Sequence, residues 1–169
     1  MKHSFRLAFL LLFFISLNSF AQTAAQVLAQ NGLNKATAND REGAIVDYTK
    51  SLELEQNPEV YYKRAIAYMQ TRQFAKSLED FDKAATLKKE DTDFFFLRGK
   101  VKSILKDYKG AIQDYDNAIK FKADNGEAYF FRALSKIELK DNVGACKDLK
   151  KAVDLKYDKA LSTLQSNCK

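Results

Sequence analysis

A repeat with a period near thirty-four residues constrains this sequence more than any other feature. Four segments resemble one another: GAIVDYTKSLEL (43–54), KSLEDFDKAATL (76–87), GAIQDYDNAIKF (110–121) and GACKDLKKAVDL (144–155). In each segment a small residue is followed four positions later by an aromatic residue or leucine, and three positions after that by another small residue. Spacings of three and four place these residues on one face of a helix. Repeats of this length indicate helical units that stack on one another.

Each of these segments follows another stretch with helical spacing and a short polar turn. Tyr61, Ala65 and Tyr68 share one helical face, and a polar turn at 71–73 follows them. Pro58, the only proline, stands where a helix should begin, a position that tolerates proline because the first N–H groups have no partner within the helix. We therefore predict an all-α chain of four helix–turn–helix repeats with a C-terminal capping helix. The repeats are expected at about 25–57, 58–91, 92–125 and 126–157, and the capping helix at 158–168.

The repeats resemble the tetratricopeptide repeat family. The resemblance rests on first helices that open with aromatic residues, an arginine and a small residue, and on aromatic residues in the turns. The openings are YYKRA (61–65), FFLRG (95–99) and YFFRA (129–133), and the turn aromatics are Phe74 and Tyr108. The resemblance covers about residues 24–157. It implies a right-handed α-α superhelix whose first helices line the inner face.

The first twenty-one residues have the pattern of a bacterial-type secretory signal. Residues 1–6 are short and basic, residues 7–17 are almost continuously apolar, and the small residues Ser19 and Ala21 follow. This order predicts cleavage after Ala21. The apolar stretch is shorter than the roughly 20 residues of a membrane-spanning helix, which favours cleavage over a retained anchor. We expect the domain at 22–169 to be exported, either periplasmic or secreted.

Composition argues against several classes of function. The only histidine, His3, lies in the predicted signal, so the remaining chain lacks the commonest general base and metal ligand. The sequence also contains no glycine-rich phosphate loop and no cluster of metal ligands. We therefore expect no enzymatic activity, no cofactor and no bound metal. The net charge of +6 is spread along the chain without a basic cluster, so nucleic acid is not an expected partner.

Three arginines recur along the chain, each followed sixteen residues later by an aspartate. The arginines are Arg64, Arg98 and Arg132, and their aspartates are Asp80, Asp114 and Asp148; the first repeat has Asp47, with Asn31 in place of the arginine. A buried guanidinium needs a carboxylate partner, so the spacing predicts a structural ladder of ion pairs. Each arginine can bond the aspartate of its own repeat, that of the preceding repeat, or both. A row of arginines that binds an anionic ligand is the alternative, which the matched aspartates disfavour because they would neutralise it.

The family resemblance also implies a binding surface on the inner face of the first helices. The residues expected there are Tyr62, Ile66, Met69, Phe96, Lys100, Phe130, Leu134 and Ile137. They form either an apolar, aromatic groove for a peptide or protein segment, or a set of packing contacts between neighbouring first helices. Some family members hold the C-terminal carboxylate of a peptide with lysines and asparagines on this face. That set of residues is not matched here.

Cys146 and Cys168, the only cysteines, are expected to form a disulfide. Each lies eleven residues from Tyr157, at the centre of the predicted turn between two antiparallel helices, so the two cysteines should lie at the same level. Export favours oxidation. A zinc site is a weaker interpretation, because two cysteines without histidine leave it incomplete.

Together these features predict a non-enzymatic scaffold of the bacterial envelope or secreted space that binds a peptide or protein of unspecified identity in its concave groove. The alternative is an architectural subunit that assembles through its convex face or its ends, with an empty groove.

Overall fold

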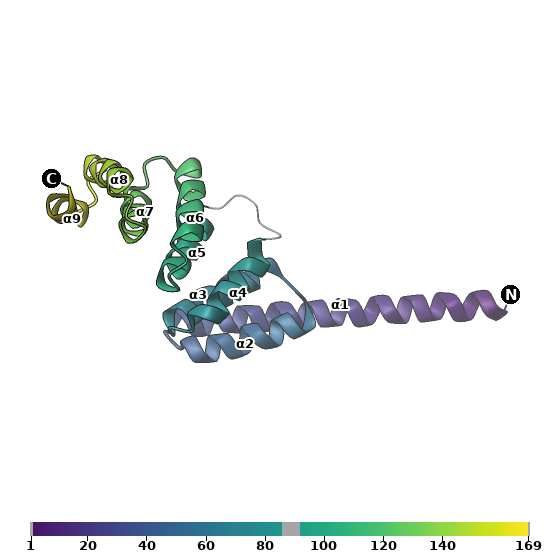
Figure 1. Ribbon diagram of the computed structural model, residues 1–169. Coiled ribbons are helices and arrows are strands. Elements are labelled where there is room, and N and C mark those ends of the chain that lie inside the picture. Colours follow the sequence, from purple (N-terminus) through teal and green to yellow (C-terminus); the bar gives the residue numbers. More distant parts are fainter. Residues whose placement is uncertain (1, 86–91, 169) are drawn as a thin grey trace. The chain divides into compact units, whose positions relative to one another are not determined.

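A computed structural model describes residues 2–85 and 92–168, with side chains from Phe20 onward. Over these residues the chain forms nine α-helices and no strand, so the predicted all-α class is confirmed (Figure 1). The helices are α1 Lys2–Thr37, α2 Arg41–Leu54, α3 Pro58–Gln70, α4 Phe74–Ala85, α5 Thr92–Ile104, α6 Tyr108–Phe121, α7 Gly126–Glu138, α8 Asn142–Asp154 and α9 Ala160–Asn167.

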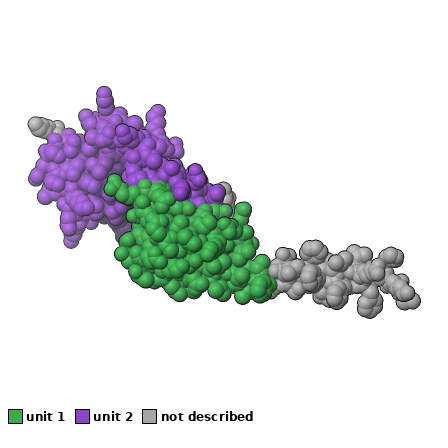
Figure 2. Space-filling view, turned by 90° about the horizontal axis from the view of Figure 1, so that it is seen from below, with its two compact units in different colours: residues 1–73 green, residues 74–169 purple. Residues whose placement is uncertain are grey.

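The chain divides into two compact units, residues 1–73 and 74–169 (Figure 2). Unit 1 contains α1 to α3 and unit 2 contains α4 to α9. The predicted cleavage point after Ala21 falls within α1, and the side chains of residues 1–19, which carry most of the signal pattern, lie outside the described part of the chain. In the part that the structure describes, we find no helix with the length and apolar character that crossing a membrane requires.

The turns inside the helix pairs share one geometry, which the α5–α6 turn shows. Lys106 has a φ of 65°, in the left-handed region, which ends α5 and reverses the chain. The side chain of Asp107 then accepts the N–H of Gly110 at 3.0 Å, and so caps the first turn of α6. The α1–α2 and α7–α8 turns repeat this arrangement with Asn39 and Asp40, and with Lys140 and Asp141.

In unit 1, α2 packs against both α1 and α3. Ala44, Tyr48 and Ser51 of α2 are buried on one face, as their helical spacing predicts. Ser51 also donates a hydrogen bond of 2.8 Å from Oγ to the carbonyl of Ala25, which fixes α1 against α2. The part of α1 that follows the predicted cleavage site therefore carries this contact.

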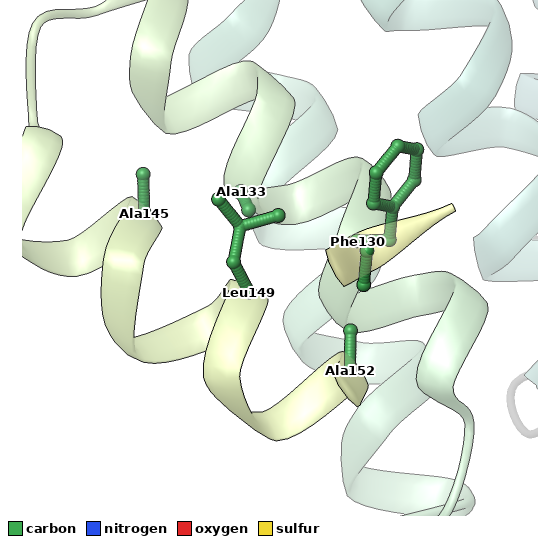
Figure 3. Packing of buried hydrophobic residues seen from close by; sticks show 6 residues of the cluster. Phe130, Ala133, Ala145, Leu149 and Ala152 are labelled. Atoms are coloured by element: carbon green, nitrogen blue, oxygen red, sulfur yellow. The ribbon is translucent and has the colours of Figure 1, made fainter. Parts of the chain in front are cut away.

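In unit 2, α7, α8 and α9 share one apolar cluster (Figure 3). Leu149 of α8 lies against Ala133 of α7 and between Ala145 and Ala152, and all four are fully or almost fully buried. Ala160 of α9 is also buried in the cluster. The small side chains let the helices approach closely, and the leucine fills the space between them.

The size of the first-helix residue at the contact with the second helix depends on the side chain opposite it. Gly99 of α5 lies under the ring of Tyr115, so close that a Cβ on Gly99 would come within 2.8 Å of it. Gly32 of α1 faces Tyr48 in the same way, at 2.7 Å. Where the second helix has Leu149 in place of tyrosine, the first helix has room for alanine, Ala133. Each glycine is therefore required by the ring opposite it rather than by a turn.

Candidate functional site

An apolar pocket of about 220 Å³ lies on the first-helix face of unit 1, the face that carries the predicted groove residues. Ile66 is the predicted residue that lines it, on α3, and Leu33 and Ala36 line it from α1. The complete lining is Leu33, Ala36, Thr37, Tyr48, Lys63, Ile66, Ala67 and Gln70. Tyr62 and Met69 are partly exposed on α3 but are not among the lining residues.

The polar side chains of this pocket are engaged with neighbours. Lys63 Nζ lies 3.2 Å from Glu59 Oε1, one turn earlier on α3. Gln70 accepts a hydrogen bond of 3.0 Å through Oε1 from Arg41 Nε of α2. The remaining lining is mainly apolar, so the pocket suits an uncharged, apolar side chain of a ligand.

Capping at the start of α3 holds this wall of the pocket in place. Asn57 accepts the N–H of Glu59 at 2.9 Å, and Pro58 is the first residue of the helix, as predicted. The carboxylate of Glu59 also lies at the positive end of the helix dipole. Ile66 therefore lies on a well-anchored helix.

Phe96 and Phe130 lie in packing clusters rather than on an open groove. Phe96 is only 8% exposed and Phe130 only 7% exposed. The ring centre of Phe96 is 5.8 Å from that of Phe131, and the ring centre of Phe130 is 5.1 Å from that of Tyr157. This corrects the expectation that both rings face a partner: they join α5 to α7, and α7 to the turn before α9. Packing between neighbouring first helices was the alternative that their sequence pattern allowed.

Lys100, Leu134 and Ile137 are the predicted groove residues of unit 2 that keep partly exposed side chains. Lys100 Nζ lies 4.9 Å from the ring centre of Phe131, a cation–π contact, and 3.8 Å from Glu127 Oε1. The first-helix face of unit 2 therefore combines apolar surface with a cation that already contacts an aromatic ring and an acid.

The arginine ladder is present in unit 2. Arg98 binds Asp114 with two parallel hydrogen bonds, Nε to Oδ2 at 2.8 Å and Nη2 to Oδ1 at 2.6 Å. Arg132 binds Asp148 with the same two bonds and the same lengths. Burial lowers the pKa of each guanidinium, but the bonds to its own aspartate and to an acid of the preceding helix pair outweigh burial, and the net pKa is raised. Both arginines therefore stay charged.

Each of these arginines also reaches back to the preceding helix pair. Arg98 Nη1 donates to Asp82 at 3.2 Å, and Arg132 Nη1 donates to Asp116 at 2.6 Å. The contact with the preceding pair is therefore made to these aspartates and not to the predicted Asp80 and Asp114. Each arginine thus bonds one acid sixteen residues after it and another sixteen residues before it.

Lysines complete the ladder twelve residues before the buried aspartates. Lys102 Nζ lies 2.8 Å from Asp114 Oδ2, and Lys136 Nζ lies 2.8 Å from Asp148 Oδ2. In the first helix pair Lys35 Nζ lies 2.7 Å from Asp47 Oδ2, although Asn31 replaces the arginine there. The lysine–aspartate contact is therefore common to three helix pairs.

Arg64 lies in unit 1 and Asp80 lies in unit 2. Arg64 of α3 donates from Nη1 to Thr49 Oγ1 of α2 at 3.0 Å, and its guanidinium lies 5.6 Å from the ring centres of Tyr61 and Tyr68. Asp80 is buried in α4. Thr49 is the counterpart of Asp82, thirty-three residues earlier, so this arginine too reaches back to the preceding second helix.

Cys146 of α8 and Cys168, at the end of α9, are joined by a disulfide with a Cα–Cα distance of 5.7 Å. The antiparallel arrangement about Tyr157 places the two cysteines at the same level, as expected. The bond fixes the capping helix to the last second helix.

The sequence interpretation missed Asp82, Asp116 and the lysines. A search for acids both before and after each arginine would have found the aspartates, because the two spacings are equal. Lys102 and Lys136 were visible thirty-four residues apart, but a lysine on a packing face can also extend its ammonium group into water. Whether the ammonium group bonds the buried aspartate or extends into water depends on how the helices pack.

Comparison with known proteins agrees with this architecture. Residues 58–91 and 92–125 each match the tetratricopeptide repeat family, and they contain the α3–α4 and α5–α6 pairs. No curated protein sequence matches the chain.

The solved structures similar to the chain include a MamA protein and two tetratricopeptide repeat domains. A crystal structure of the MamA protein has a TM-score of 0.79 and 21% identity, covering 83% of this chain and 79% of that one. The tetratricopeptide repeat domain of Arabidopsis OM64 has a TM-score of 0.64 and 23% identity, covering 70% and 98%. The first such domain of Spaghetti (RPAP3), bound to the HSP90 peptide SRMEEVD, has a TM-score of 0.65 and 26% identity, covering 70% and 94%. With its two matching repeats and paired helices, the chain contains tetratricopeptide repeats and has the fold of these solved structures.

Proposed function

We propose that this chain is a non-enzymatic interaction scaffold that binds a peptide or protein segment on its first-helix face. The observation that carries this proposal is the apolar pocket between α1 and α3, because Ile66 on its wall was expected to face a ligand. Tetratricopeptide repeats generally mediate protein–protein interaction, and the similar domain of Spaghetti binds a peptide.

The proposed contact surface is smaller than the one expected from sequence. The predicted side chains that are partly exposed on the first helices are Tyr62, Ile66, Met69, Lys100, Leu134 and Ile137. Phe96 and Phe130 support the first helices from within. In unit 1 the pocket suits an apolar side chain of a ligand. In unit 2 Lys100 suits an acidic group.

We also propose that the protein is exported and acts in the periplasm or outside the cell. The support is the order of a basic start, an apolar stretch and small residues before Gln22. N-terminal sequencing of the protein isolated from its native cells should give Gln22 as the first residue. A chain that still begins with Met1 in the soluble cytoplasmic fraction would refute export.

The groove proposal is tested by placing a photo-crosslinking amino acid at position 66 in native cells. Partner adducts are expected at position 66 and absent when the same amino acid replaces Val46, which is 49% exposed on α2 of the same unit. The variant Ile66→Asp should abolish recovery of the crosslinked partner, because a carboxylate would be desolvated in the apolar pocket. Val46→Asp is the matched control and should have no effect.

The alternative function, assembly through the convex face or the ends, predicts the opposite pattern. In that case position 66 gives no adducts, and Ile66→Asp leaves partner recovery unchanged while the chain remains folded. Circular dichroism and the unfolding midpoint of each variant show whether a loss of binding comes from a loss of structure.

A further inference from the structure

A second groove, of about 830 Å³, lies between α8 and α9 at the C-terminal end of unit 2. Its lining includes Val143, Cys146, Lys147 and Lys150 from α8, Leu164 from α9, and Cys168 directly after α9. These elements are a second helix and the capping helix, so the groove is separate from the first-helix face.

The apolar part of this groove is unusually accessible. Val143, in the first turn of α8, is 71% exposed. The residues at the same place in the two preceding second helices are Ala75 and Lys109. An exposed β-branched residue here gains nothing for the packing of unit 2, whereas it could bury its surface against a bound segment.

The charged part of the groove is cationic. Lys147 and Lys150 are exposed, and neither pairs with a carboxylate among the residues that the structure describes. No acidic residue is among the described lining residues. Asp141, directly before α8, has its carboxylate bonded to the N–H of Gly144. The charge of the groove therefore complements an acidic ligand.

Lys150 stands where the next acid would follow Asp82 and Asp116, the acids that link successive helix pairs. Asp82 and Asp116 accept bonds from the arginines of the following first helices, and Lys150 stands thirty-four residues after Asp116. Ser166 of α9 stands where the next arginine would be. The α8–α9 contact therefore has no counterpart of the arginine–aspartate bond that links the earlier pairs. The positive charge of Lys150 suits a ligand with negative charge.

The disulfide holds the second wall of the groove. α9 has only eight residues, too few for a stable helix by itself in water. Leu164 packs against the α7–α8 cluster, and the Cys146–Cys168 bond fixes the end of α9 beside α8. Both sulfurs belong to lining residues, so the groove and the disulfide form one structure.

We propose that the α8–α9 groove is a second binding site, which takes an acidic protein segment with an apolar anchor residue, and that the disulfide is required for this binding. The anchor side chain lies against Val143 and Leu164, and carboxylates pair with Lys147 and Lys150.

The probe is a displayed library of random twelve-residue peptides, selected on the oxidised chain in low salt and then synthesised for affinity measurement. We expect the selected peptides to be enriched in Asp and Glu beside an aliphatic or aromatic residue. The double variant Lys147→Glu/Lys150→Glu should weaken their binding at least about tenfold, since it places like charges opposite one another. The matched control, Lys109→Glu/Lys120→Glu, changes two exposed lysines of α6 outside the groove and should leave binding unchanged.

Two further variants separate the anchor from the disulfide. Val143→Asp should weaken binding, and Cys146→Ser/Cys168→Ser should do so to at least the same degree, while Ile66→Asp should have no effect on these peptides. The proposal is overturned if the selection yields no acidic enrichment, or if the lysine reversal leaves the affinity unchanged. It is equally overturned if the groove is occupied by a second copy of the chain, seen as a dimer in sedimentation that the lysine reversal dissociates.

Discussion

The α1–α2 and α5–α6 pairs both neutralise a buried aspartate with cations, but they contain different numbers of charges. In α1–α2 the buried Asp47 meets Lys35, one acid with one cation. In α5–α6 the buried Asp114 meets both Lys102 and Arg98, and Arg98 also meets Asp82 of the preceding helix. The second arrangement contains two acids and two cations, so charge balances in both pairs.

The difference shows that the arginine accompanies a bond to the preceding second helix, which goes to Thr49, Asp82 or Asp116. α1–α2 has no preceding pair in the described chain, and it has asparagine where the others have arginine. The lysine–aspartate contact belongs to a single helix pair, whereas the arginine joins consecutive pairs. The ladder is therefore structural: Asp114 and Asp148 are buried, and each is bonded by an arginine and a lysine of the same chain.

Removal of the arginine should give the largest effect on stability. Arg98→Ala leaves the buried Asp114 with one cation in place of two, and we expect it to lower the free energy of unfolding by about 3 kcal/mol. Equilibrium unfolding in urea measures this loss. Asp82→Asn is the control. Because Asp82 is 57% exposed, water screens its contact, and the loss should not exceed about 1 kcal/mol. A larger loss for Asp82→Asn than for Arg98→Ala would contradict this account of the ladder.

A smaller loss is expected from Gly99→Ala, about 2 kcal/mol, because the new methyl group would overlap the ring of Tyr115. The reference is α7–α8, which has Ala133 opposite Leu149. In a Tyr115→Leu background, Gly99→Ala should therefore stabilise the chain by about 0.5 kcal/mol, since alanine favours the helix. Urea unfolding of the four proteins gives the coupling. An equal loss in both backgrounds would show that the Tyr115 ring is not the reason for glycine at position 99.

Tyr48 and Tyr115, the two most deeply buried tyrosines of the described residues, allow a comparison at high pH. Tyr115 shares a hydrogen bond of 3.2 Å with Ser103, which lies 3.0 Å from Ser135, whereas the hydroxyl of Tyr48 bonds to none of the described residues. Tyr115→Phe should cost about 1 kcal/mol near neutral pH, and Tyr48→Phe should cost less.

Burial raises the pKa of both tyrosines above their ordinary value of 10.0. The folded state therefore holds these protons more tightly than the unfolded state does. Below pH 10 both tyrosines are protonated in the folded and the unfolded state, and they cause no change in the free energy of unfolding. Above pH 10 the unfolded state loses these protons first, so the free energy of unfolding falls as the pH rises. Each Tyr→Phe variant should lose less stability than the parent between pH 9 and 11, as measured by urea unfolding at each pH. If both variants lose as much stability as the parent between pH 9 and 11, other titrating groups cause the loss.

The repeat pattern was sufficient to predict the helix pairs, because small residues at spacings of three and four have one natural place, the contact between helices. It also predicted the bonds of Arg98 and Arg132 to their own aspartates, since a buried guanidinium has few alternatives. These predictions depend on contacts within one helix pair, where sequence spacing determines the geometry.

The inner face was predicted less well. Phe96 and Phe130 stand at the repeat position of Tyr62, yet both rings are buried and Tyr62 is partly exposed. Whether such a ring is exposed depends on the size of the neighbour on the next first helix, such as Phe131 beside Phe96. The spacing within one helix does not contain that information. The cationic α8–α9 groove was missed for a related reason: it depends on where the short α9 packs.

Asn31→Arg should have the smallest effect and is the sharpest test of the comparison. The substitution restores the arginine of the other pairs, sixteen residues before Asp47, but it adds a second cation beside Lys35 without a second acid. We expect the free energy of unfolding in urea to change by no more than about 0.5 kcal/mol, because an exposed charge gains little from a partner that is already neutralised. A gain as large as the loss in Arg98→Ala would show that the bond within the pair supplies most of the energy. The arginines would then stabilise single repeats, and their bonds to the preceding helices would be secondary.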